Sequence, residues 1–196
     1  SFPTRRSSDL ISDNYATGKG GGIKSGSDGP TVLINCTIKN NQSQTRGGGI
    51  YLDMGQGAVM NNCLVTNNEA SETGGGLYLA GGGGVWSIDF FNNTVANNIS
   101  DGISGIALYQ GATMNIINSI IWETEPIMET SSTGHENDIS IDYSLIANGI
   151  NGVNIYEGNV YWGANNISSD PLFCNADNSD FTLYDNSPCV GTGQDS

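Results

Sequence analysis

Aliphatic residues recur along this chain at a period of 25 to 30 positions, and each stands three residues before a position that is usually Asn. We take this aliphatic residue as an anchor. The anchors are Ile11, Ile38, Val65, Val95, Ile121 and Ile146, and the intervals between them are 27, 27, 30, 26 and 25 residues. A period of this length is typical of a solenoid, in which each repeat is one structural unit stacked on the next.

Two polar signals accompany the anchors. Three residues after the anchor stands a column of asparagines, namely Asn14, Asn41, Asn68 and Asn98. Nine to eleven residues after the first three anchors stand glycine triplets: Gly20, Gly21, Gly22; Gly47, Gly48, Gly49; and Gly74, Gly75, Gly76. An aliphatic residue closes each triplet. The fourth repeat has the degenerate form Ser104-Gly105-Ile106.

The segments between these signals read as short β-strands. Runs such as residues 31–38 and 50–53 are rich in β-branched and aromatic residues, and no segment has a sustained helical periodicity. A unit this short buries its apolar face only by stacking on a neighbour, with about 4.8 Å between equivalent strands. The sequence therefore predicts an all-β fold, a single-stranded parallel β-helix of about five to six turns, right-handed like most parallel crossovers.

Within such a solenoid the asparagines and glycines have structural roles. Asn tolerates the left-handed backbone region, and its amide can bond to the amide above and below, so we expect a ladder. The triplets are expected at corners that need positive φ or leave no space for a Cβ. A phosphate-binding loop would need a helix after the glycines, whereas Ile50, Tyr51 and Leu52 favour a strand.

These repeats resemble the right-handed parallel β-helix proteins of bacterial surfaces and secretions, which share the pectate-lyase-like fold. They are similar to chlamydial polymorphic outer-membrane protein repeats, which pair Phe-x-x-Asn with Gly-Gly-Ala-Ile. Here Ile38-x-x-Asn41 and the segment 47–50 stand in those places, with Ile for Phe and Gly for Ala. The segments 170–173 and 187–189 resemble the closing region of secreted β-helix proteins. The resemblance implies the fold and a bacterial surface or extracellular location.

The chain divides into three parts by composition. Residues 1–10 lack the repeat spacing, and all ten match the translation of a common sequencing adapter, so we interpret them as an assembly artefact in a metagenomic fragment. Residues 11–168 are the expected β-helix. Residues 169–196 are expected to form an irregular closing segment, which ends before any anchor domain.

The charge balance excludes several partners. Six Lys or Arg face twenty Asp or Glu, giving a formal charge of −14. Nucleic acid needs clustered cations, so we expect no nucleic-acid partner. No apolar run approaches the roughly 20 residues of a membrane helix, so we expect no membrane insertion.

The four cysteines fall into two pairs. Cys36 and Cys63 occupy equivalent positions two residues before their anchors, where parallel neighbours are poorly placed for a disulfide. We interpret them as small buried residues, facing inward with the anchors. The spacing of Cys174 and Cys189 in the closing segment allows a disulfide, which would suit an exported protein.

Candidate ligand-binding residues are few. Trp122 follows the anchor Ile121 and is expected to project outward, so it is the candidate platform for stacking a sugar ring, core filling being the alternative. The segment 122–138 departs from the repeat and is expected to be an inserted loop. Its acidic residues include Glu123, Glu125 and Glu129, which could bind calcium, although a solvated acidic loop is the alternative. We assign no catalytic residue and no other cofactor.

From these observations we expect a non-catalytic extracellular or cell-surface module for adhesion or glycan binding. Its partner would be a glycan or another cell-surface polymer. A carbohydrate-active enzyme, either a polysaccharide lyase or a glycoside hydrolase, is one alternative, because the fold hosts both. An autotransporter-like passenger fragment is another.

Overall fold

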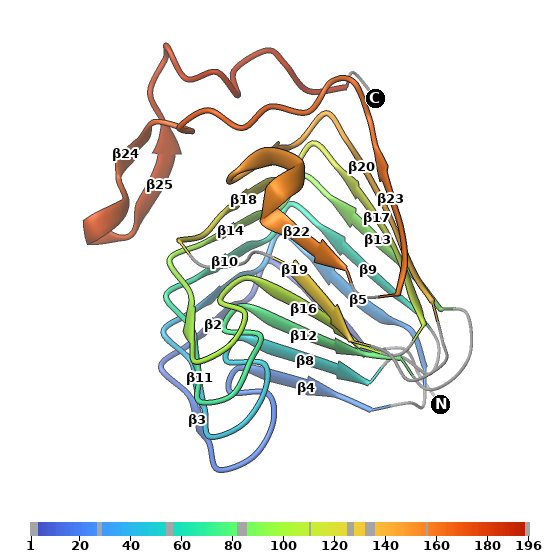
Figure 1. Ribbon diagram of the computed structural model, residues 1–196. Helices are drawn as coiled ribbons and strands as arrows, with labels where there is room; N and C mark the ends of the chain where they lie inside the picture. The colour runs from blue at the N-terminus through green and yellow to red at the C-terminus, as the bar shows by residue number, and fades with distance from the viewer. Residues whose placement is uncertain are drawn as a thin grey trace.

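The computed structural model describes residues 4–26, 29–53, 57–81, 86–109, 111–124, 128–131, 136–155 and 157–194. Within these ranges the chain winds into stacked coils, where a coil is one full circuit of the solenoid (Figure 1). Each strand pairs in parallel with the equivalent strand of the next coil. The predicted all-β parallel β-helix is therefore confirmed.

Two long sheets form two sides of the solenoid, and each is named here after its first strand. The β1 sheet consists of β1 (Thr4–Ser7), β5 (Thr31–Ile34), β9 (Ala58–Asn61), β13 (Trp86–Phe91), β17 (Ala112–Ile117), β20 (Asn137–Asp142) and β23 (Gly158–Trp162). The β2 sheet consists of β2 (Leu10–Ser12), β6 (Thr37–Lys39), β10 (Leu64–Thr66), β14 (Thr94–Ala96), β18 (Ile120–Trp122) and β21 (Leu145–Ile146).

A short and a long sheet complete the circuit. The β3 sheet consists of β3 (Tyr15–Ala16), β7 (Gln42–Ser43), β11 (Glu69–Ala70) and β15 (Ile99–Ser100). The β4 sheet consists of β4 (Ile23–Ser25), β8 (Ile50–Asp53), β12 (Leu77–Ala80), β16 (Ile106–Tyr109), β19 (Met128–Ser131) and β22 (Val153–Ile155). In the described ranges, the first four coils contain all four strands and the next two lack the short one.

The described helices are short. They are the 3₁₀ turns η1 (Gly149–Gly152), in the sixth coil, and η2 (Ala176–Asn178), in the closing segment. No helix among the described residues has the length and apolar character to cross a bilayer.

All six predicted anchors stand in register in the β2 sheet. Ile38 pairs with Ile11 and Val65, and the pairing continues through Val95, Ile121 and Ile146. The five anchors from Ile38 onward are fully buried. Core side chains of the β1 and β4 sheets stack in the same way, for example Leu52, Leu79 and Leu108. Burying such aliphatic columns is the main stabilising term of the solenoid.

The inward parity of the cysteines is also confirmed. Cys36 and Cys63 are 1% and 3% exposed, while the preceding Asn35 and Asn62 are exposed. These two asparagines have φ values of 55° and 54°, so they form a left-handed corner between the β1 and β2 sheets. The same column continues with left-handed Asn92 and Asn118 in later coils.

An asparagine ladder runs through the corner between the β2 and β3 sheets. Asn14, Asn41 and Asn68 each donate from the backbone N–H and from Nδ2 to the Oδ1 of the asparagine one coil further on. In the first four coils the left-handed conformation belongs to the residue before the ladder, Asp13, Asn40, Asn67 or Asn97. Corner geometry and ladder bonding are therefore divided between two adjacent columns.

The glycine triplets pack directly on this ladder, and the second coil shows how. Gly47 has φ +67°. A Cβ on Gly48 would clash with the carbonyl group of Glu69 in the next coil. A Cβ on Gly49 would lie 2.7 Å from the oxygen of Gly76 and 2.9 Å from Nδ2 of Asn68. The two sequence signals recur together because the last glycine leaves space for the ladder amide of the next coil.

Residues 4–7, which were set aside with the segment 1–10, form β1 and pair with β5. One expectation about organisation is corrected. The segment 122–138 is not simply an inserted loop, because residues 128–131 form β19 and pair with β16 and β22. That coil has neither a glycine triplet nor an Asn pair, so the sequence gives no sign that its strand belongs to the repeat.

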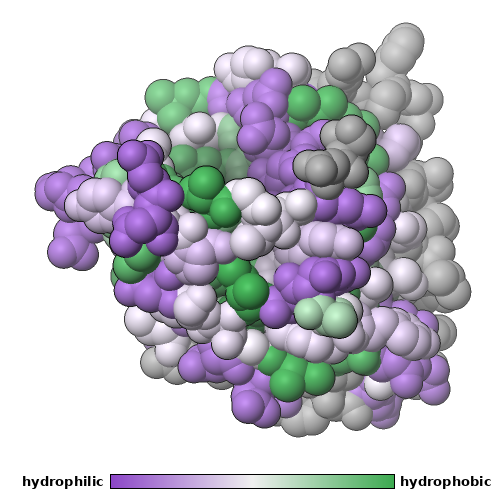
Figure 2. Space-filling view, turned by 90° about the horizontal axis from the view of Figure 1, so that it is seen from above, coloured by the Kyte–Doolittle hydropathy of each residue, from purple (hydrophilic) through white to green (hydrophobic). Residues whose placement is uncertain are grey.

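The closing segment folds back over the outside of the β2 sheet (Figure 1). Its hairpin of β24 (Phe173–Asn175) and β25 (Asp180–Leu183) projects from the side of the solenoid and carries many polar residues (Figure 2). The corner asparagines hold this segment. Asn67 donates to Ser179 Oγ, Asn97 donates to the Ala176 carbonyl, and Asn118 exchanges two hydrogen bonds with the backbone of Gln194.

Candidate functional site

Tyrosines form a column on the outer face of the β4 sheet. Tyr51 and Tyr78 stand at paired positions of β8 and β12, and their rings stack with centroids 5.4 Å apart and planes at 3°. Both side chains are only 4% exposed. Tyr109, in β16, is paired with Ala80 rather than with Tyr78, and its ring lies 6.4 Å from that of Tyr78 and is tilted by 31°. Such stacking is favourable beyond the area that it buries.

Each of the two stacked rings carries a cation from the preceding coil. Lys19 Nζ lies 4.7 Å from the Tyr51 centroid and donates to its hydroxyl at 2.9 Å. The Arg46 guanidinium lies 5.3 Å from the Tyr78 centroid and donates to its hydroxyl at 3.3 Å. Both cations stand one residue before a glycine triplet. The loop that carries each triplet therefore folds its cation over the ring of the next coil.

Arg46 also forms an ion pair with Glu72. Nε of Arg46 lies 2.9 Å from a Glu72 carboxylate oxygen, and the side chains are 39% and 50% exposed. Burial acts to lower the pKa of Arg46, but the hydrogen bond that Arg46 donates to Glu72 and the nearby charges outweigh it and raise the pKa. Burial raises the pKa of Tyr78, so this ring stays neutral and keeps its hydroxyl proton. Arg46 is thus held as a fixed cation.

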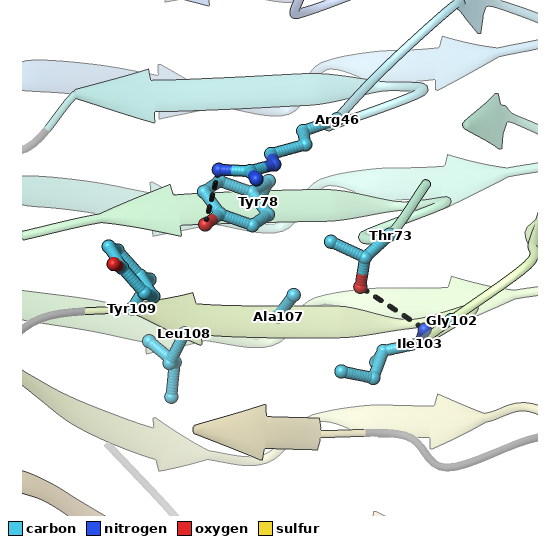
Figure 3. Close-up of a pocket in the computed structure, with 8 residues that line it drawn as sticks. All are labelled: Arg46, Thr73, Tyr78, Gly102, Ile103, Ala107, Leu108 and Tyr109. Atoms are coloured by element: carbon cyan, nitrogen blue, oxygen red, sulfur yellow. Dashed lines mark hydrogen bonds between the residues drawn. The ribbon is translucent and has the colours of Figure 1, made fainter. Parts of the chain in front are cut away.

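A pocket opens where the tyrosine column is interrupted (Figure 3). In β16 the position paired with Tyr78 is Ala107, so no protein ring stands there. The opening has a volume of about 300 Å³. We call it the tyrosine pocket, and its principal lining residues are Arg46, Thr73, Tyr78, Ile103, Ala107 and Tyr109.

The walls of the tyrosine pocket differ in chemistry. Figure 3 shows Tyr78 with Arg46 on one side, Tyr109 at one end, and Thr73 with Gly102 and Ile103 at the other. Thr73 Oγ1 accepts a hydrogen bond from the Ile103 backbone N–H at 3.2 Å. The pocket thus offers the partly exposed ring of Tyr109 together with hydroxyl and guanidinium groups, a combination that suits a ring with polar substituents.

Trp122, the candidate sugar platform, does not stand free on the surface. Its side chain is only partly exposed and packs against the main hydrophobic core. The alternative weighed from the sequence, a core-covering role, describes its position better. Trp162 packs in the same way, and the side chain of Trp86 lies outside the described residues.

Glu123, the first candidate calcium ligand, is corrected in both place and role. It is 6% exposed and accepts hydrogen bonds from the backbone N–H and from Nδ2 of Asn98. It therefore ends the asparagine ladder as the rung after Asn98. Glu123 stands two residues after its anchor Ile121, whereas Asn98 stands three residues after Val95. The difference arises because this coil lacks the left-handed corner residue.

Burial dominates the titration of Glu123. Desolvation raises its pKa to about 8, against the opposing effect of the two hydrogen bonds from Asn98. Glu125 and the side chain of Glu129 lie outside the described residues. In the part of the chain that the structure describes, no group of three or more His, Cys, Asp or Glu could hold a metal ion.

All four cysteines are free in the structure. Cys174 and Cys189, the candidate disulfide pair, are partly exposed thiols in the closing segment and are not bonded to each other. Burial raises the pKa of Cys189, and it raises that of Cys63 to about 11, so both stay protonated at neutral pH. The inner pair has the buried structural role expected from the sequence.

The tyrosine pocket is the site that sequence reasoning missed. A signal was present, because Tyr51 and Tyr78 are 27 residues apart and each follows the aliphatic residue that closes a triplet. Lys19 and Arg46 are also 27 residues apart, but the rings beneath them and the Glu72 partner of Arg46 were not expected.

Comparison with known proteins agrees with the fold. The profile of the family described as "Right handed beta helix region" matches residues 4–104, a little over half of the chain. No curated protein and no solved structure matches the chain.

Proposed function

The chain belongs to the family of right-handed β-helix regions, and from that premise we propose that it is a non-catalytic glycan-binding module of a cell surface or extracellular medium. The observation that carries this proposal is the tyrosine pocket. It presents an aromatic ring, a fixed guanidinium and hydroxyl groups around a space of about 300 Å³.

The geometry favours a pyranose ring as the occupant. The ring of Tyr51 packs flat against Tyr78, and the position of the next ring is taken by Ala107. A sugar placed there would pack its C–H face against the partly exposed ring of Tyr109 and direct hydroxyl groups toward Arg46 and Thr73. Sugar recognition commonly combines such stacking with a few convergent polar groups.

The recognition surface is rigid, which supports binding rather than chemistry. The strands β8, β12 and β16 are paired along their whole length, so the rings are held in register at little entropic cost. Among the described residues, Glu72 is the carboxylate that contacts a lining residue, and it is paired with Arg46. Glycoside hydrolysis needs two acidic groups across the scissile bond.

The test uses two variants that alter the pocket in opposite ways. Ala107→Tyr continues the tyrosine column and fills the pocket, as the preceding coils do, while Tyr109→Ala removes an end wall. Binding to a panel of purified polysaccharides and oligosaccharides is measured by glycan array, and affinities are then measured by calorimetry. We expect at least a tenfold loss of affinity in Ala107→Tyr and a smaller loss in Tyr109→Ala.

The control is Tyr161→Ala, in the β1 sheet, whose ring is 57% exposed. It should leave the affinity unchanged. If Tyr161→Ala abolishes binding while Ala107→Tyr does not, the site is wrongly placed. If a glycan is bound and shortened during incubation, the non-catalytic assignment fails.

A further inference from the structure

The tyrosine column has a second regularity, which concerns charge. We propose that the tyrosine pocket selects a sugar carrying a free ammonium group, that is, an amino sugar without N-acylation. This inference rests on the proposed function and narrows it from glycans in general to one chemical class.

The inference starts from a repeated pair. In two successive coils a cation placed just before a glycine triplet lies over the tyrosine ring of the next coil, first Lys19 on Tyr51 and then Arg46 on Tyr78. In both pairs the cation also bonds to the hydroxyl of the ring. A cation held over an aromatic face is favourable, and more so when it is partly desolvated.

The next pair, between the third and fourth coils, breaks this pattern at both of its positions. The residue paired with Arg46 in the third coil is Thr73, which is uncharged. The residue paired with Tyr78 in the fourth coil is Ala107, which has no ring. The tyrosine pocket lies between these two changes and is lined by both residues. The pocket therefore lies where the repeat would otherwise put one tyrosine ring and one cation.

Tyr109 closes one end of this place, and among the described residues no Lys or Arg side chain lies over its ring. An amino sugar would supply both absent parts, a ring over Ala107 and an ammonium group to reach the face of Tyr109. A neutral sugar would supply only the ring.

Charge complementarity supports a cationic ligand. The chain has a formal charge of −14. Close to the tyrosine pocket, Glu72 lies beside Arg46, and the exposed Asp101 directly precedes the lining residue Gly102. The single cation Arg46 is already paired, so the surroundings do not repel an ammonium group. They would repel a uronate, because a polyanion gains little from a surface of this sign.

The experiment compares four tetrasaccharides by calorimetry at low salt and at a pH where the amine is protonated. Three have the same β-1,4-linked ring and differ only at C2, namely the tetramers of glucosamine, N-acetylglucosamine and glucose. The fourth is tetragalacturonate. We expect the glucosamine tetramer to bind at least tenfold more tightly than the two neutral tetramers. This preference should shrink as salt screens the charge.

A variant of the cation position makes the test specific. Thr73→Lys places the protein's own ammonium group where the preceding coils have one. It should abolish the preference for glucosamine, whereas Ser87→Lys adds the same charge at an exposed position of the β1 sheet and should not.

The two proposals fail in different ways. If the neutral tetramers bind at the tyrosine pocket with the same affinity as the glucosamine tetramer, the ammonium inference is overturned and glycan binding stands. If tetragalacturonate binds most tightly, the sign of the inference is wrong. If no saccharide binds to the unmodified chain, or if Ala107→Tyr binds every saccharide as tightly as the unmodified chain does, the proposed glycan site itself fails.

Discussion

The first four coils and the two that follow solve the same packing problem with different residues. The early coils carry Asn in the ladder column and, in the first three, a glycine triplet that packs on it. The later coils have neither signal, yet Ile121 and Ile146 pair in the same register as Ile38 and Val65. The aliphatic column thus persists where the corner signals are lost. Asn side chains bond across the corner in the early coils, and Glu123 takes that place in the fifth coil.

A second column inside the solenoid shows the same substitution of residues more closely. It begins with Cys36 and Cys63 and continues with Asn93, Ser119 and Ser144. Cys63 donates its thiol to the carbonyl two residues before it, at 3.5 Å, and Ser119 donates its hydroxyl in the same way at 3.0 Å. Thiol and hydroxyl thus occupy one geometric position, although their spacing from the anchors is all that relates them in the sequence.

The largest expected effect comes from removing a central rung of the early ladder. Asn68→Ala leaves the Asn41 N–H and the Ile38 carbonyl without their present partners in a buried corner. Because each buried unsatisfied group costs about 1–3 kcal/mol, we expect the free energy of unfolding to fall by about 3 kcal/mol or more. Chemical denaturation followed by circular dichroism measures this.

The matched control for the ladder is Asn154→Ala, at an exposed position of β22. It should change stability by no more than about 0.5 kcal/mol. If both variants lost the same free energy of unfolding, the hydrogen bonds of the ladder would contribute no more to stability than an exposed asparagine does.

A smaller effect is expected at the glycine that contacts the ladder. Gly49→Ala introduces a Cβ 2.9 Å from Nδ2 of Asn68, so the coils must separate slightly. We expect a loss of about 1–3 kcal/mol, the usual cost of overpacking. Gly18→Ala, where an added Cβ meets nothing within 4 Å, serves as the control in the same denaturation experiment. If both variants are equally stable, the close contact does not constrain the coils.

The third effect is a pH dependence that belongs to the later coils. The pKa of Glu123 is raised by burial to about 8 from 4.5, so the folded state holds its proton more tightly than the unfolded state. Stability from this group is therefore full below pH 4.5 and is lost as the pH rises toward 8. The expected slope is at most about 1.4 kcal/mol per pH unit.

Glu123→Gln removes this titration while keeping an acceptor for Asn98. Denaturation midpoints measured between pH 5 and pH 9 should fall less steeply in Glu123→Gln than in the unmodified chain. Glu69→Gln, at an exposed position of β11, should leave the slope unchanged. Parallel curves for all three proteins would place the pH dependence elsewhere.

The parts of this structure that could be predicted are those that repeat. Six anchors at intervals of 25 to 30 residues predicted the register of the β2 sheet, because side chains of one column must stack to stay buried. Asn and Gly marked the corners for the same reason. The place of Glu123 could not be predicted, since a deletion of one corner residue shifts the column without changing the anchor.

The tyrosine pocket was beyond sequence reasoning for another reason. Tyr51 and Tyr78 repeat, but the pocket exists because Ala107 and Thr73 do not. A site defined by missing members of a repeat becomes visible only when the neighbouring coils are placed side by side. Docking of the closing segment joins residues more than 70 positions apart, such as Asn97 and Ala176, and leaves no local signal.

The one-way donation along the ladder has a consequence for how the protein is made. The side-chain amide of Asn41 donates forward to Asn68, which leaves the ribosome 27 residues later, and Asn68 donates forward to Asn98 in turn. A newly synthesised coil therefore ends in amide donors that have no ladder acceptor until the next coil is made. The hydrogen bonds of each coil are complete only after the following coil has folded. Glu123, whose carboxylate accepts from Asn98, is the residue at which this dependence on later synthesis stops.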